Sequence, residues 1–93
     1  MEETTLKSYR KSIDEIDRNI VNLICNRMML SKLIGQYKKE KNISILDTNR
    51  WNEVKQNISN ELKSIAKHYN QDFSELLDKI YEIIHEYSKK NQI

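Results

Sequence analysis

The stretch LKSYRKSIDEIDRNIVNLICNRMMLSKLIGQYKKEK, residues 6–41, carries an apolar residue every three or four positions along much of its length. That spacing places them on one stripe of an α-helix. The stripe consists of Leu6, Ile13, Ile16, Ile20, Leu23, Ile24, Leu30 and Ile34. The pattern predicts a helix from about Thr5 to about Lys41, roughly 55 Å long at ~1.5 Å per residue. A chain of 93 residues cannot enclose such a helix in its own core, so the stripe predicts a partner helix, most simply from a second copy.

Two shorter helices are expected after this long one. A connection at 42–46 leads into the first, which Asp47 or Thr48 can cap and which continues to about Tyr69. Its apolar stripe is Trp51, Val54, Ile58, Leu62 and Ile65.

The last helix follows a second connection at 70–71. Asp72 with Glu75 three residues later indicates a capping box at its start, and it ends near Gln92. Its inward face is predicted to hold Phe73, Leu77, Ile80, Tyr81, Ile84 and Ser88. The chain is therefore expected to be all-α, with three helices in a single domain over residues 1–93.

The composition limits the class of protein. Hydrophobic residues make up 38% of the chain and charged residues 32%, while one Gly and no Pro leave little turn chemistry for a sheet. A formal charge of +2 is weak for a nucleic-acid-binding module, which remains one alternative. The lone Cys25, the absence of a long apolar run and the lack of a signal-peptide pattern favour a cytoplasmic protein with no membrane association.

Three cations lie on or beside the apolar stripe of the long helix: Arg10, Arg27 and Lys38. Because a buried unpaired cation costs several kcal/mol, we expect an anionic ligand to pair with these three side chains. The chain has only four arginines against twelve lysines, and arginine suits a two-pronged grip on a carboxylate. The alternative is that each side chain buries its stem and keeps its charged head in water.

The helical positions of these cations suggest how they act together. Arg27 and Lys38 share one face about 16 Å apart, so a small dianion fits between them. Arg10 lies about 25 Å from Arg27 along the axis and about 100° round it. If two long helices pack antiparallel, Arg10 of one chain approaches the Arg27 region of the other, which predicts composite sites in a homodimer.

Four blocks of the sequence carry a family resemblance, in order and with matching spacing. They are YRKSIDEIDR at 9–18, NRMMLSKLIGQYK at 26–38, DTNR at 47–50 and IYEIIHEYSKKNQ at 80–92. Together they resemble the small all-helical chorismate mutases over nearly the whole chain. The resemblance implies an intertwined homodimer that rearranges chorismate to prephenate in aromatic amino-acid biosynthesis, without nucleophile, metal or cofactor.

The resemblance also implies roles for single residues. Arg27 and Arg10 of the partner subunit would clamp the two substrate carboxylates, while Lys38 and Gln92 would donate hydrogen bonds to the ether oxygen that breaks. Supporting positions in the substrate-binding set would be Ser88, Arg50 and Asp47.

One residue departs from the family pattern. After the arginine of the third block the family has a Glu that accepts a hydrogen bond from the ring hydroxyl, and here Trp51 stands in its place. Indole has one donor and no acceptor. Either Trp51 is only part of the core, or it changes the substrate. Isochorismate pyruvate lyase, 4-amino-4-deoxychorismate mutase and a non-catalytic dimer of this fold are therefore kept as alternatives.

The register of the last helix is a second open point. Matching without a gap gives the site roles to Ser88 and Gln92, and a shift by one residue would give them to Tyr87 and Asn91. In the favoured register His85 occupies a usually aliphatic position and is expected to be a core or rim residue.

Overall fold

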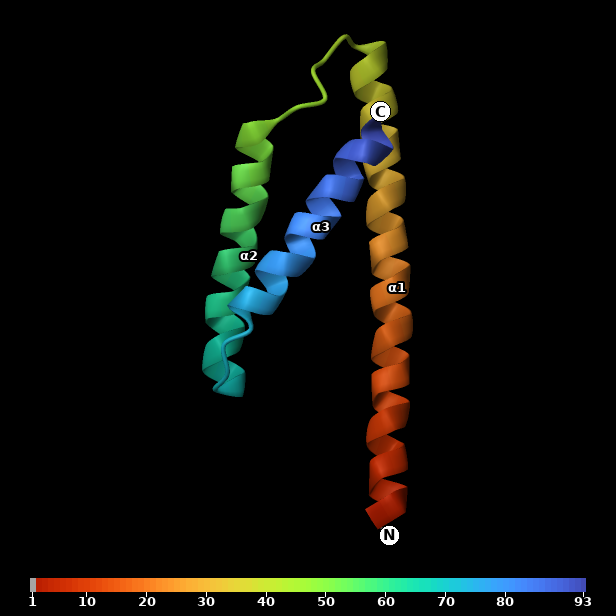
Figure 1. Ribbon diagram of the computed structural model, residues 1–93, viewed down its shortest axis with the longest axis vertical. Coiled ribbons are helices and arrows are strands. Elements are labelled where there is room, and N and C mark those ends of the chain that lie inside the picture. The colour runs from red at the N-terminus through yellow and green to blue at the C-terminus, as the bar shows by residue number, and fades with distance from the viewer. Residues whose placement is uncertain (1) are drawn as a thin grey trace. The chain divides into compact units, whose positions relative to one another are not determined.

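The computed structural model describes residues 2–93 and contains three helices within that range (Figure 1). They are α1 (Glu2–Glu40), α2 (Thr48–Tyr69) and α3 (Ser74–Gln92). No strand occurs among these residues, so the all-α prediction is confirmed. Helix α1 begins three residues earlier than expected and ends one residue earlier.

The end of α1 is fixed by Asn42, whose φ of 56° is left-handed. The amide of Ile43 donates to the carbonyl of Lys38 at 2.8 Å, and the amide of Asn42 donates to that of Lys39 at 3.4 Å. This pair of bonds is the Schellman pattern, which satisfies carbonyls that the helix itself leaves open. The chain therefore turns at Asn42, one helical turn after Lys38, which is one of the predicted site residues.

The starts of α2 and α3 differ. Asp47 caps α2 as predicted, because its Oδ1 accepts a hydrogen bond from the amide of Arg50 at 2.9 Å. The predicted capping box of α3 is wrong. Phe73 is the N-cap residue there, and Asp72 accepts from Ser74, two residues on, through both the amide (2.9 Å) and the hydroxyl (2.7 Å). The Asx turn that Asp72 makes with Ser74 takes the carboxylate that the capping box would have used.

The described residues form two compact units, and α1 runs through both. The first unit ends at Leu30 and the second comprises Ser31–Ile93. In the first unit every apolar residue of the predicted stripe is exposed, by between 39% and 66%. These side chains have the spacing of a buried helix face, yet they are exposed in the described structure.

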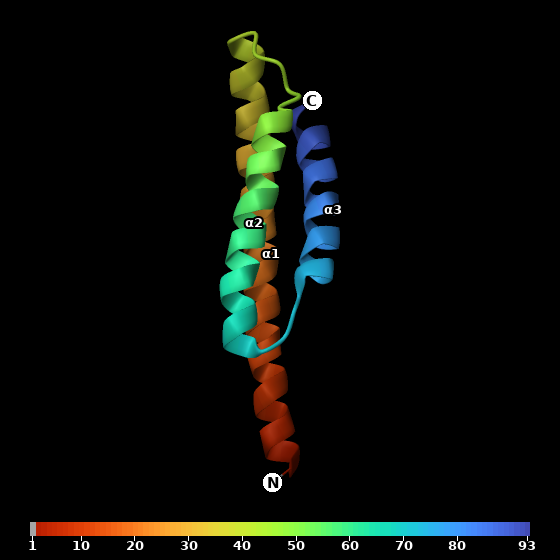
Figure 2. The same ribbon diagram turned by 90° about the vertical axis from the view of Figure 1, so that its left-hand side faces the viewer.

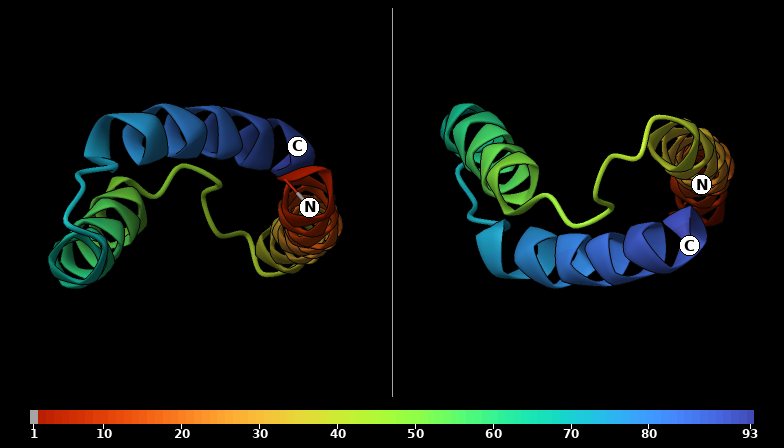
Figure 3. Two further views of the ribbon diagram at one scale, coloured as in Figure 1. Left: turned by 90° about the horizontal axis from the view of Figure 1, so that it is seen from below. Right: turned by 90° about the horizontal axis from the view of Figure 1, so that it is seen from above.

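The second unit contains the helix packing. Helices α2 and α3 run side by side in Figure 2 and are in contact. Helix α3 crosses from α2 at its start to α1 at its end (Figure 3), where Gln92 lies against Gly35. Among the described residues Ile84 is the one buried apolar side chain, while Trp51, Val54, Ile58 and Leu62 are half-buried on the predicted face of α2. No helix among the described residues is long and apolar enough to cross a membrane.

Candidate active site

Helix α3 meets α1 through small and polar side chains. Ser31 and Gly35 are four residues apart on α1, hence on one face, and both are buried. The hydroxyl of Ser31 donates to the backbone carbonyl of Ser88 at 2.8 Å. A Cβ atom on Gly35 would lie 2.5 Å from the Cα of Gln92. The two backbones therefore approach so closely that only glycine fits at position 35.

This contact holds Gln92 by its side chain as well. Its Nε2 donates to Ser31 Oγ at a long 3.4 Å, and its Oε1 is buried without a hydrogen-bond partner among the described residues. An amide nitrogen carries two hydrogens, so one donor of Gln92 is left after the bond to Ser31. The Gln92 amide is thus held at its nitrogen, has a buried oxygen, and keeps one N–H that can donate to a ligand.

The contact with α1 is made by Ser88 and Gln92 rather than by the residues of the shifted register. Ser88 is buried and Gln92 half-buried, whereas Tyr87 and Asn91 are exposed. The inward-facing pair is the one that the ungapped match singled out.

Lys38 is half-buried near the end of α1. Its Nζ donates to the backbone carbonyl of Ile45 at 3.1 Å and so ties the connection between α1 and α2 to the helix. The ammonium group has three donors, so this bond still leaves it able to meet a second acceptor.

Arg50 lies in the first turn of α2, next to its cap. Its guanidinium forms a short ion pair with Glu53 on the following turn, and both side chains are exposed. An exposed pair of this kind contributes about 0–1 kcal/mol. The guanidinium is therefore free to turn from Glu53 to a ligand carboxylate at little cost.

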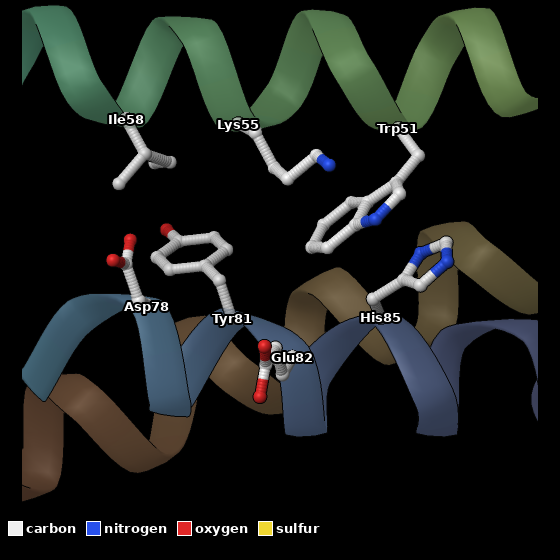
Figure 4. Close-up of a pocket in the computed structure, with 7 residues that line it drawn as sticks. All are labelled: Trp51, Lys55, Ile58, Asp78, Tyr81, Glu82 and His85. Atoms are coloured by element: carbon white, nitrogen blue, oxygen red, sulfur yellow. The ribbon is translucent and has the colours of Figure 1, made fainter. Parts of the chain in front are cut away.

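Trp51 lines a pocket and contacts a second aromatic ring. Its indole stacks on the imidazole of His85, with ring centroids 3.8 Å apart and planes 8° from parallel. The two rings belong to a pocket of about 360 Å³ between α2 and α3 (Figure 4). Its lining residues are Trp51, Lys55 and Ile58 from α2 and Asp78, Tyr81, Glu82 and His85 from α3.

Six of the eight predicted site residues fall in the second unit: Lys38, Asp47, Arg50, Trp51, Ser88 and Gln92. Within it the structure joins Asp47 directly to Arg50, and Ser88 to Gln92 through Ser31. Arg10 and Arg27 belong to the first unit, where Arg10 is exposed and Arg27 half-buried. Their joint action with the other six stays a prediction.

The sequence reasoning missed Ser31 and Glu53 and gave His85 no role beyond the core or rim. Ser31 had a signal in its spacing, since two small residues four apart allow another backbone to come close. Glu53 had one too, three residues after Arg50 on the same helix. In the described part of the chain no three His, Cys, Asp or Glu side chains gather as metal ligands.

Comparisons with known proteins agree with this architecture. A family model described as "Chorismate mutase type II" matches residues 9–93. The curated chorismate mutase of Methanocaldococcus jannaschii is 33% identical over 87 residues, which cover 94% of this chain and 83% of that protein. No solved structure gave a significant match. With the family model matching nearly the whole chain, from before Arg10 to beyond Gln92, the chain belongs to the type II chorismate mutase family.

Proposed function

We propose that the chain catalyses the rearrangement of chorismate to prephenate. The observation that carries the proposal is the family match over residues 9–93, which includes all eight predicted site residues. In this reaction one C–O bond breaks and one C–C bond forms within a single molecule. The protein has to hold the compact reactive conformer and stabilise charge on the breaking ether oxygen.

Binding of the two carboxylates falls to the arginines. Arg27 takes one carboxylate and Arg10 of the partner subunit takes the other, with Arg50 in support. Planar guanidinium groups suit this work because each offers two parallel donors to a carboxylate. The half-buried position of Arg27 supports the assignment, since partial desolvation strengthens a charged contact.

Stabilisation of the ether oxygen falls to Lys38 and Gln92. A cation and a neutral donor are the groups that developing negative charge requires. Two features support this: Lys38 keeps donors beyond its bond to Ile45, and the Gln92 amide is held by Ser31 with one donor left. Preorganised donors of this kind are typically worth about 10²–10³ in rate each.

Assembly into a homodimer belongs to the same proposal. The exposed apolar stripe of α1, with Ile13, Ile16 and Ile20 at its centre, supports it. Burying apolar surface stabilises by about 25 cal/mol per Å², and a second copy of α1 offers a matching stripe. The antiparallel arrangement would bring Arg10 of the partner subunit to each site.

Trp51 favours a second candidate within the same fold. Its stack on His85 puts two flat rings in the place where a carboxylate acceptor is expected. A buried ring hydroxyl without an acceptor costs about 1–3 kcal/mol. The favoured substrate would then be one whose ring substituents differ from those of chorismate. The two candidates are isochorismate and 4-amino-4-deoxychorismate.

A product assay tests these candidates together. The purified protein is incubated separately with chorismate, isochorismate and 4-amino-4-deoxychorismate, and the products are separated by chromatography. Prephenate formed at an enzyme-like rate is the expected result. Salicylate with pyruvate, or a rearranged amino analogue, with little prephenate, would replace chorismate by the second candidate. No product from any substrate would make the chain a non-catalytic dimer of this fold.

A further inference from the structure

The Trp51–His85 stack connects two parts of the second unit that each carry predicted site residues. Trp51 directly follows Arg50 in the first turn of α2, and its amide donates to the carbonyl of Asp47 at 3.1 Å. His85 precedes Ser88 by three residues on α3, so it lies one turn earlier on nearly the same face. The stack thus joins the turn that holds Arg50 to the helix segment that holds Ser88.

The α3 side of this link is bonded to α1 through buried groups, whereas the α2 side is more exposed. Ser88 and Gln92 are fixed to α1 through Ser31 and Gly35. The first turn of α2 has its own cap, but Arg50 and Asp47 are exposed. The bond from Lys38 to Ile45 ties the preceding connection to α1, and the stack of Trp51 on His85 is the contact that links this turn directly to the helix carrying Gln92.

The indole has a neighbour besides His85. The amine of Lys55 lies 5.4 Å from its ring centroid, and Figure 4 shows the indole between the Lys55 amine and the His85 imidazole. A cation and a stacked ring restrict the indole more than one contact would. Since His85 is half-buried and lies on the anchored helix, it is the neighbour that sets the indole plane.

We propose that His85 is a positioning residue of the substrate site. Its imidazole fixes the plane of Trp51, and through Trp51 it fixes the turn that presents Arg50 to the substrate. The inference rests on the proposed function, because Arg50 has a substrate to meet only if the chain binds chorismate or its analogue. The feature that matters is the flat face of the side chain, not its charge.

The test compares three variants of the full-length protein. His85→Leu removes the flat face, His85→Phe keeps it, and His68→Leu is the matched control, since His68 is the only other histidine and is exposed. Steady-state kinetics are measured with the substrate that the wild type converts. Trp51 is the only tryptophan, so its emission spectrum reports on the indole directly.

His85→Leu is expected to raise KM about tenfold, the factor that one stacking contact supplies, with kcat nearly unchanged. Its Trp51 emission should shift to longer wavelength because one indole face becomes wet. His85→Phe should recover most of the KM and the wild-type emission, and His68→Leu should resemble the wild type in both.

Several results would overturn the proposal. One is an unchanged KM in His85→Leu, whether or not the emission shifts. Another is a failure of His85→Phe to recover KM, which would assign the role to the imidazole nitrogens instead. If His85→Leu does not fold, His85→Ala, which also removes the flat face, takes its place in the comparison with His85→Phe. A wild type that converts none of the three substrates would remove the proposed function itself, and that outcome is visible before any variant is measured.

Discussion

The two units of the chain carry the same helical pattern of apolar residues and use it differently. In residues 31–93 the apolar faces pack within the chain, since α3 packs on α2 and contacts α1 through Ser88 and Gln92. In residues 2–30 the apolar stripe from Leu6 to Leu30 is exposed in the described part of the chain. An amphipathic pattern therefore states that a face will be buried, but not which chain buries it.

Among the substitutions considered, a charge on the exposed stripe should have the largest effect on assembly and activity. Ile16→Asp places a charge at the centre of the proposed dimer interface, where its desolvation is costly. We expect dissociation to monomers and loss of activity, measured by size-exclusion chromatography with light scattering and by prephenate formation. Asn22→Asp adds the same charge about 240° round the helix and should leave the dimer intact. A dimeric, active Ile16→Asp protein would mean that the stripe has another partner.

Arg27 tests whether the first unit takes part in catalysis. Arg27→Ala removes the proposed carboxylate grip and should lower kcat/KM by more than about a hundredfold, without a change in oligomeric state. The matched control is Arg18→Ala, an exposed arginine on the same helix that has no proposed role. A wild-type rate in Arg27→Ala would remove Arg27 from the proposed site.

Gly35 tests the contact inside the second unit. Two effects of Gly35→Ala oppose each other. Alanine favours the helix by up to about 1 kcal/mol, but its Cβ would lie 2.5 Å from the Cα of Gln92 and 2.9 Å from its carbonyl carbon. Overpacking against backbone costs about 1–3 kcal/mol, so we expect a lower Tm and about tenfold lower activity as Gln92 moves. Gln36→Ala, next to it and exposed, gives the baseline, and a Tm at or above that of the wild type would refute the close contact.

Asp72 offers the smallest effect, outside the proposed site. The side-chain and backbone hydrogen bonds from Ser74 hold the pKa of this exposed carboxyl below its ordinary value. A lowered pKa in the folded state means that ionised Asp72 stabilises the fold above the unfolded pKa of about 3.9, and that this is lost as pH falls through the folded value. Asp72→Ala should therefore lower Tm slightly at pH 7, and the difference should shrink towards pH 3. A difference that grows in acid would contradict this sign.

Periodicity sufficed to predict the three helices, because it records the burial that each face requires. Trp51, Val54, Ile58 and Leu62 lie on the predicted face of α2, and Ile84 and Ser88 on that of α3. Local chemistry was less decisive. Asp72 has two possible uses, a capping box with Glu75 or a turn with Ser74, and the sequence does not say which has the better geometry.

Contacts among the predicted site residues could be predicted where they are local in the sequence and not where they join two helices. Asp47 was expected from its capping preference, and its bond to Arg50 agrees. The role of Ser31 under Ser88 and the stack of His85 on Trp51 depend on where two helices cross. Such contacts join residues 57 positions apart in the first case, and no local pattern encodes them.

The bond from Lys38 to the carbonyl of Ile45 has a consequence for how kinetic defects are understood. The same ammonium group closes the connection between α1 and α2 and is proposed to meet the ether oxygen. Lys38→Met removes both the bond to Ile45 and the proposed donor to the ether oxygen, so a lower rate in this variant reflects both losses. The entropy of an untied loop would appear in the temperature dependence of binding, whereas a lost donor would appear at the barrier. A temperature series of KM and kcat would therefore separate two roles that a single rate constant combines.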